Sequence, residues 1–315
     1  MEPLTRNFYI FDSDTGSDDC AALLLAGAYA RSRCALLLST YGNYSLSTTT
    51  ANLCTSAAMG GFSGSVLTGA AEPLPVEGTD AEPTPHAVPR GLVFTEYSPD
   101  FPAGIPHRES PDFLAEVYEA ICAHAPCDYI AIGPLTNLAL LLRRYPDVRG
   151  KLGEVVIMGG GLQLANVNAY AEYNIYCDAL AAEEVFASGL SIHMAGLDVC
   201  MPTALRETDL ARLRTLRGPL GRCMEHLVQI ENDLSDSFGN PHGIIYDAVA
   251  LAYYLAPELF RVRRTGVRVV TKGEQYGRTV EAPERGNVVF LESAGMDGYT
   301  ELLVGGIERL TAERG

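Results

Sequence analysis

Four aspartates are crowded into eight residues near the start of the chain. Asp12, Asp14, Asp18 and Asp19 lie in FDSDTGSDDC, directly before the apolar run AALLLA. One or two acidic side chains suit the start of a helix, where they cap free N–H groups and favour the helix dipole. Four would repel one another unless a cation lies among them. Carboxylates without neighbouring Cys or His pairs suit Ca²⁺ or Mg²⁺. The stretch therefore predicts a metal site, with helix capping as the simpler alternative.

Two other acidic motifs compete for the same stretch. An EF-hand loop counted from Asp12 does not fit, because Gly16 is its fifth residue and Leu23 stands where a bidentate Glu is required. The sequence FDSDT after a strand has the D-x-D-x-T form of haloacid-dehalogenase-like phosphatases, in which Asp12 would be the nucleophile. The following GSDD is not expected there, and no convincing phosphate-binding Lys or second acidic pair follows. The phosphatase remains the less favoured alternative.

Short apolar runs alternate with segments of helical period, which is typical of βαβ units and a mostly parallel sheet. We predict an α/β fold with a single open, mostly parallel (mixed) sheet flanked by helices, and one domain over 1–315. Such sheets bind ligands outside the carboxyl ends of their strands. The predicted strands are 7–11, 34–42, 128–133, 154–160 and 191–199, the predicted helices are 18–32, 46–60, 134–148, 178–189 and 246–260, and the predicted long loops are 71–111, 161–177 and 232–245.

The composition limits the partners. A formal net charge of -16 argues against nucleic acid or an anionic membrane as the main partner. The eight cysteines are scattered without a C-x-x-C pair, which favours reduced thiols over a disulfide framework. No apolar run approaches the roughly 20 residues that span a bilayer, and no export signal is apparent. We therefore expect a cytoplasmic protein that binds neither nucleic acid nor membrane.

The acidic stretch also has the form D-x-D-x-G-x-D-D at the end of a first strand. In this form it resembles the inosine-uridine preferring nucleoside hydrolase family, which cleaves the N-glycosidic bond of ribonucleosides with a bound Ca²⁺. Four further segments resemble that family in the same order, so the likeness runs from about residue 7 to 260. They are TYGNYSL (40–46), AIGPLTNLAL (131–140), NVNAYAEYNIYCDALAAEEVF (166–186) and YDAVALAYYLAPELF (246–260).

The resemblance implies a nucleoside hydrolase-like fold and a role for each matching residue. It implies that Ca²⁺ is held by Asp14, Asp19, Asp247 and the backbone carbonyl of Ile132, and that Asp14 is also the general base. The residues that it implies for substrate binding are Asp18 on a ribose hydroxyl, Asn43 near metal and ribose, and Asn166, Glu172 and Asn174 on the 3′- and 5′-hydroxyl side of the sugar.

The chain departs from the family where the leaving base needs a proton. Many members have His directly before the C-terminal Asp, and here that position is Tyr246. Tyrosine is a poorer acid near neutrality because its pKa is about 10. Tyr246 would stack on a base or donate a hydrogen bond, and His242 is the alternative acid. His86 in PHAVPRG falls near the family's H-G-x-x-G loop, with Ala87 in place of the first Gly.

These features predict a Ca²⁺-dependent hydrolase that releases free base and ribose from ribonucleosides in nucleoside catabolism. The resemblance implies a homo-oligomer, either a dimer or a tetramer. The aromatic residue in place of His favours purines, and hence purine salvage. A non-catalytic nucleoside- or ribose-binding protein is the main alternative, because Tyr246 replaces the expected acid.

Overall fold

The computed structural model describes residues 7–75, 103–238 and 242–314. A nine-stranded sheet runs through this part of the chain in the order β4-β3-β2-β1-β5-β6-β7-β11-β8. Neighbouring strands are parallel except β11 and β8, which confirms the predicted mostly parallel, mixed sheet. The strands are β1 (Tyr9–Ser13), β2 (Cys34–Ser39), β3 (Val66–Thr68), β4 (His107–Arg108), β5 (Cys127–Ala131), β6 (Leu152–Met158), β7 (Ile192–Ala195), β8 (Phe260–Thr265) and β11 (Val288–Ala294). A separate antiparallel pair is formed by β9 (Val267–Val269) and β10 (Thr279–Glu281).

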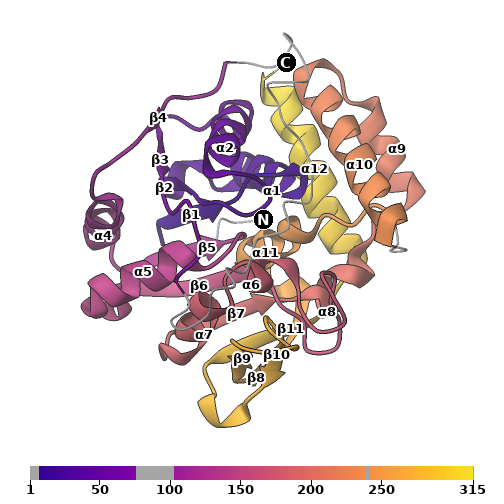
Figure 1. Cartoon of the computed structure of the whole chain (residues 1–315). Helices are drawn as coiled ribbons and strands as arrows, with labels where there is room; N and C mark the ends of the chain where they lie inside the picture. Colours follow the sequence, from indigo (N-terminus) through magenta and orange to yellow (C-terminus); the bar gives the residue numbers. More distant parts are fainter. Residues whose placement is uncertain (1–6, 76–102, 239–241, 315) are drawn as a thin grey trace.

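Helices cover both faces of the sheet (Figure 1). Helices α4, α5 and α7 contribute to one apolar cluster, and α1, α2 and α8 to α12 contribute to the other. No helix in the described ranges is long and apolar enough to cross a membrane. The helices are α1 (Ser17–Tyr29), α2 (Leu46–Gly60), α4 (Phe113–Ala123), α5 (Thr136–Arg144), α6 (Tyr173–Cys177), α7 (Ala179–Ala187), α8 (Leu197–Cys200), α9 (Glu207–Thr215), α10 (Gly218–Phe238), α11 (Tyr246–Leu255) and α12 (Met296–Arg314).

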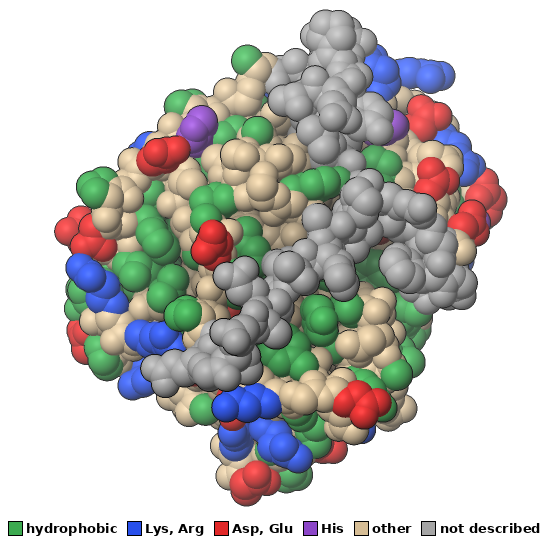
Figure 2. Space-filling view, in the orientation of Figure 1, with side chains coloured by type: hydrophobic (Ala, Val, Ile, Leu, Met, Phe, Trp, Pro, Cys, Tyr) green, Lys and Arg blue, Asp and Glu red, His purple; other side chains and the backbone are tan. Residues whose placement is uncertain are grey.

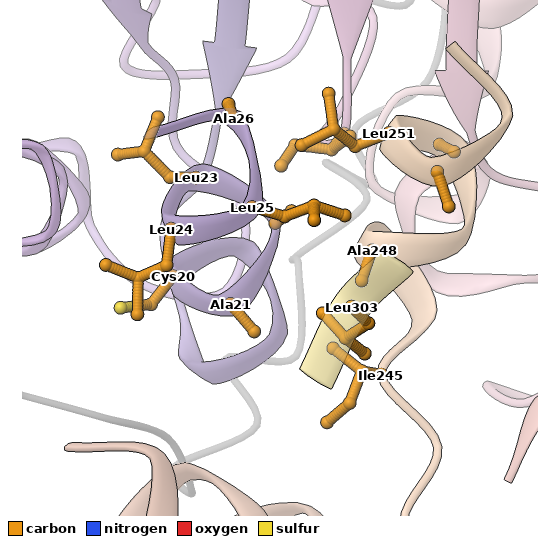
Figure 3. Packing of buried hydrophobic residues seen from close by; sticks show 14 of the residues in the cluster. Cys20, Ala21, Leu23, Leu24, Leu25, Ala26, Ile245, Ala248, Leu251 and Leu303 are labelled. Carbon is orange, nitrogen blue, oxygen red and sulfur yellow. The ribbon is translucent and has the colours of Figure 1, made fainter. Parts of the chain in front are cut away.

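The two clusters follow from the alternation of side chains along each buried strand. In β1, Tyr9 and Phe11 enter the cluster that contains α1, while Ile10 enters the cluster that contains α5. Helix α1 is itself buried on almost every side: in Figure 3, Leu25 points towards Leu251 and Ala248 of α11, whereas Leu23 and Leu24 point away from that helix. A first strand and a first helix that are both buried hold the intervening turn, residues 14–16, in one place.

Between the neighbouring strands β1 and β5 the chain changes direction across the sheet. From β1 the chain crosses through α1 to β2, and from β5 it crosses through α5 to β6 on the other side. Helices α1 and α5 lie on opposite faces, so the chain leaves β1 and β5 towards opposite sides of the sheet. Open α/β sheets bind ligands at such a switch point.

Several predicted boundaries are wrong. The helix expected over 134–148 is Thr136–Arg144, and the loops expected over 71–111 and 161–177 contain β4 and α6. The strand expected over 191–199 ends at Ala195, and α8 begins after Gly196. The helix expected over 246–260 ends at Leu255, because Pro257 cannot continue it, and Phe260 already belongs to β8. The loop expected over 232–245 overlaps α10, which continues to Phe238.

The edge strand β8 carries basic side chains that are paired with acidic ones. Arg263 contacts both Glu281 and Glu292, and Arg261 Nη2 lies 3.5 Å from Glu292 Oε2. The face drawn in Figure 2 shows blue and red side chains together at its lower end, where Figure 1 draws β8 to β10. Charged side chains along an exposed edge hinder its pairing with other strands.

Candidate active site

Four acidic side chains meet at the carboxyl end of β1. Asp14 directly follows β1, Asp18 and Asp19 lie in the first turn of α1, and Asp247 lies in the first turn of α11. Carboxylate oxygens of Asp18, Asp19 and Asp247 all lie within 4.8 Å of one another. Asp14 is not one of this trio, but its charge is close enough to raise the pKa of Asp247. The fold therefore brings residues from opposite ends of the sequence into one acidic cluster.

The cluster is costly without a cation. Burial raises the pKa of Asp14 and Asp247, and the charges of the neighbouring aspartates raise both further. Burial and the charge of Asp19 raise the pKa of Asp18 to about 7. Buried like charges destabilise one another, and a cation among them reverses the sign of that interaction.

Hydrogen bonds fix two of the carboxylates in place. Asp19 accepts hydrogen bonds from Ser13 Oγ at 2.7 Å, from the Gly16 N–H at 2.9 Å and from Asn43 Nδ2 at 3.1 Å. The Asn43 N–H donates to Asp14 Oδ2 at 2.7 Å. Asn43 thus joins the turn after β2 to both aspartates, which is the neighbourhood in which the sequence predicts it.

Two buried carboxylate oxygens in the cluster lack a hydrogen-bond partner among the described residues. They are Asp14 Oδ1 and Asp247 Oδ1. Buried polar atoms are nearly always satisfied, so orphaned oxygens in an acidic cluster indicate a missing ligand. An all-oxygen donor set suits a hard cation such as Ca²⁺. The residues present therefore fit a metal ion.

Two glycines make room for the Asp14 carboxylate. A Cβ on Gly42 would lie 2.0 Å from Asp14 Oδ2, and a Cβ on Gly133 would lie 2.6 Å from Asp14 Oδ1. Gly133 follows Ile132, whose carbonyl accepts a hydrogen bond from Asn174 Nδ2 at 3.0 Å. The turns after β2 and β5 therefore approach Asp14 from two sides, and only glycine permits that approach.

The segment before α6 carries the predicted ribose-binding residues. Glu172 is buried, and its oxygens accept hydrogen bonds from the N–H groups of Gly160 at 2.7 Å, Asn174 at 2.9 Å and Ile175 at 3.1 Å. Glu172 is therefore the N-cap of α6 as well as a predicted ligand of the sugar. Asn166 Oδ1 is buried without a hydrogen-bond partner among the described residues.

Asp12 is a structural residue rather than an exposed nucleophile. It is 1% exposed, and its carboxylate accepts hydrogen bonds from Tyr129 at 2.7 Å and from Asn137 Nδ2 at 2.9 Å. Asn137 also donates to the Ser39 carbonyl and accepts from the Ala70 N–H, so it joins the ends of neighbouring strands. Both oxygens of Asp12 are engaged, which argues against the phosphatase alternative.

The three residues considered for the leaving base have different surroundings. The half-buried Tyr246 donates its hydroxyl to Met201 Sδ at 3.7 Å. His242 has 52% of its side chain exposed, and its Nε2 lies 2.7 Å from Asp236 Oδ1. His86 lies outside the described residues. Tyr246 adjoins Asp247 in the sequence, whereas His242 is paired at the surface.

Sequence reasoning missed a fifth carboxylate beside this cluster. Glu231 of α10 is 4% exposed and accepts a hydrogen bond from Ser17 Oγ. Burial and the charges of Asp18 and Asp19 raise the pKa of Glu231. The sequence signal was the four-residue spacing of Cys223, Leu227 and Glu231, which places a charged residue on the same helix face as two apolar ones.

The fold and the cluster together define an α/β protein with buried carboxylates gathered at the carboxyl edge of a mostly parallel sheet. Residues 9–301 match the family described as inosine-uridine preferring nucleoside hydrolase. The pyrimidine-specific ribonucleoside hydrolase RihA of Salmonella enteritidis is 30% identical over 313 residues, which cover 93% of this chain and 96% of that protein. The protein of the same name from Shewanella woodyi is 32% identical over 197 residues, 59% of this chain and 62% of that protein.

A solved structure agrees with the fold. The purine-preferring ribonucleoside hydrolase from Gardnerella vaginalis superimposes with a TM-score of 0.82 at 22% identity, covering 96% of this chain and 98% of that one. The chain belongs to the inosine-uridine preferring nucleoside hydrolase family. It is accordingly an N-glycosyl hydrolase of ribonucleosides, which confirms the predicted resemblance and the predicted class of enzyme.

Proposed function

We propose that the chain hydrolyses ribonucleosides to free base and ribose with a Ca²⁺ held by Asp14, Asp19, Asp247 and the Ile132 carbonyl. The observation that carries this proposal is the pair of orphaned oxygens, Asp14 Oδ1 and Asp247 Oδ1, in a buried acidic cluster. When bound, Ca²⁺ would orient a water molecule and the 2′- and 3′-hydroxyls of the ribose and lower the pKa of that water modestly.

The chain's own residues supply the rest of the chemistry. Asp14 accepts the proton of the attacking water, because its Oδ1 is unpartnered and its Oδ2 is held by the Asn43 N–H at 2.7 Å. The negative cluster also stabilises the positive character that the sugar gains in an oxocarbenium-like transition state.

The ribose is gripped from two sides. Asp18 is half-buried, unlike the fully buried Asp14, and it takes one ribose hydroxyl. Asn43 lies beside Asp14 and Asp19. On the other side, Asn166 offers its unpartnered Oδ1, and Glu172 and Asn174 complete the sugar site.

We propose pyrimidine ribonucleosides as the first substrates to test. The pyrimidine-specific ribonucleoside hydrolase RihA of Salmonella enteritidis is similar over 93% of this chain. The expectation of purines, and of purine salvage, depends on Tyr246 alone, and its hydroxyl is directed to Met201 Sδ. A purine preference is the alternative outcome of the same assay.

A panel of uridine, cytidine, inosine, adenosine and guanosine, incubated with and without a chelator, tests the activity. We expect release of free base from at least one pyrimidine nucleoside, loss of at least 90% of it in the chelator, and recovery when Ca²⁺ is added. Mg²⁺ is the matched control, because it demands a tighter octahedral shell. Absence of free base from every nucleoside at high enzyme concentration would refute the proposal.

Replacing Tyr246 by Phe tests how the base leaves. If Tyr246 donates a proton, kcat for nucleosides falls about 100-fold, since general acid catalysis typically contributes at least that much. Hydrolysis of 4-nitrophenyl riboside, whose leaving group needs no proton, should remain within about threefold. His242→Ala is the matched variant, and the exposure of His242 leads us to expect no change. Equal loss on both substrates would exclude Tyr246 as the acid.

Other properties remain proposals. We propose that residues 1–315 form a single domain. We also propose that the enzyme acts in the cytoplasm and that it assembles as a dimer or tetramer. Light scattering of the purified chain measures the last of these directly.

A further inference from the structure

A buried acidic side chain without a role in the proposed mechanism lies next to the acidic cluster. Glu231 is 4% exposed and comes from α10, a helix that contributes none of the predicted site residues. Its carboxylate accepts a hydrogen bond from Ser17 Oγ, and Ser17 is also 4% exposed. Burying a carboxylate costs free energy of folding unless hydrogen bonds or a nearby cation compensate for the lost hydration.

The contact belongs to a continuous interface between α10 and α1. Cys223, Leu227 and Glu231 are spaced by four residues and so lie on one face of α10. The free thiol of Cys223 is hydrogen-bonded with that of Cys20, which lies three residues after Ser17 on α1. Leu227 is fully buried in the same apolar cluster as α1. The helices therefore lie in a fixed register that places Glu231 at the N-terminal turn of α1.

That turn lacks the usual side-chain cap. The N-cap residue of α1 is Gly16, which has no side chain to accept a hydrogen bond from the helix. Asp19 is held separately by Ser13, Gly16 and Asn43. The Asp18 carboxylate accepts hydrogen bonds from its own backbone N–H and from those of Asp19 and Asp247, whereas the Ser17 hydroxyl donates to Glu231 on the neighbouring helix. The Glu231 contact is thus the side-chain anchor of the segment that presents Asp18.

We propose that Glu231 is a positioning residue that, through Ser17, fixes the direction in which Asp18 meets the ribose. Ser17 directly precedes Asp18, so a shift of the Ser17 side chain is passed to Asp18 through one peptide bond. The inference rests on the proposed function of Asp18 as a ligand of a ribose hydroxyl. The variants that test it leave the proposed Ca²⁺ ligands Asp14, Asp19 and Asp247 unchanged.

The test compares a ribonucleoside with its 2′- and 3′-deoxy analogues in variants of the full chain. Glu231→Ala should lower kcat/KM for the ribonucleoside about tenfold, the effect of losing one well-placed hydrogen bond. For the analogue that lacks the hydroxyl bound by Asp18, kcat/KM should stay within about twofold. Glu231→Gln retains an acceptor for Ser17 and should restore the ribonucleoside value to within about threefold. Ser17→Ala should reproduce Glu231→Ala, and combining the two should cost no more than either alone.

Calorimetric titration with Ca²⁺ supplies a readout apart from activity, with its Kd expected to stay within about threefold of wild type in all of these variants. Equal losses on the ribonucleoside and both analogues, or failure of Gln to restore the difference, would show that Glu231 only stabilises the fold. If the wild-type protein releases no free base, the proposed function is refuted, and the positioning role needs a separate test. The same ribose-to-deoxyribose comparison is then made on nucleoside binding, where an unchanged ratio in Glu231→Ala contradicts the positioning role.

Discussion

Asp14→Asn is expected to lower kcat for nucleoside hydrolysis by about 10³-fold or more, with little change in the fold. Loss of a general base costs about 10²–10⁴-fold, and the same change removes one charged ligand of the proposed cation. The Asn43 N–H that donates to Asp14 Oδ2 at 2.7 Å retains an acceptor in the amide oxygen of Asn. Since burial raises the pKa of Asp14, removing its charge should not lower the stability of the metal-free protein.

Stopped assays at saturating substrate, with thermal unfolding of the same sample, check this prediction. Asp297→Asn is the matched control, because the Asp297 side chain is 91% exposed and its surface pair with Arg206 should contribute little. Full activity of Asp14→Asn in the presence of Ca²⁺ would remove Asp14 from both of its proposed roles.

Asp247→Ala is expected to abolish Ca²⁺ binding and, with it, measurable turnover. Asp247 contributes an unpartnered, buried Oδ1 and lies within 4.8 Å of the Asp18 and Asp19 carboxylates. In the wild type, Ca²⁺ at about 100 times its Kd should raise the free energy of unfolding by about 2.7 kcal/mol. The variant should lose this increment, while its metal-free stability should not fall, because burial and the charges of Asp18, Asp19 and Asp14 raise the pKa of Asp247.

Thermal unfolding with and without Ca²⁺ separates the two effects. A Ca²⁺-dependent rise in melting temperature that survives in Asp247→Ala would place the cation elsewhere. Asp247→Asn provides the graded comparison, because it keeps one oxygen donor but not the charge.

The acidic stretch was predictable because its chemistry is local. Asp14, Asp18 and Asp19 lie within one turn, and the strand and helix on either side are clear in the apolar pattern. Asp247 was placed through a resemblance, since only the fold shows that α11 begins beside α1. The boundaries that failed depend on single residues, such as Gly196 and Pro257, that end one element early.

The contacts that were missed are long-range ones between polar groups. In the sequence, Glu231 is one charged residue of an amphipathic helix. Only the folded structure shows that α10 packs against α1 and that Glu231 accepts a hydrogen bond from Ser17. Tyr129 and Asn137 show Asp12 to be structural only when β1 and β5 are paired. Strands β8 and β11 had no predicted counterpart, although both belong to the main sheet.

Asn174 Nδ2 donates a hydrogen bond to the Ile132 carbonyl oxygen. This one peptide oxygen therefore connects the proposed nucleoside site with the proposed cation site. Asn174 belongs to the proposed sugar site, and the carbonyl belongs to the proposed cation site. Any shift of Asn174 on nucleoside binding alters the field that the cation meets, and the reverse also holds. Linkage requires that the factor by which Ca²⁺ tightens nucleoside binding equals the factor by which nucleoside tightens Ca²⁺ binding. If the proposed Ca²⁺ site holds, the concentration of free Ca²⁺ would set the apparent affinity of the enzyme for nucleosides.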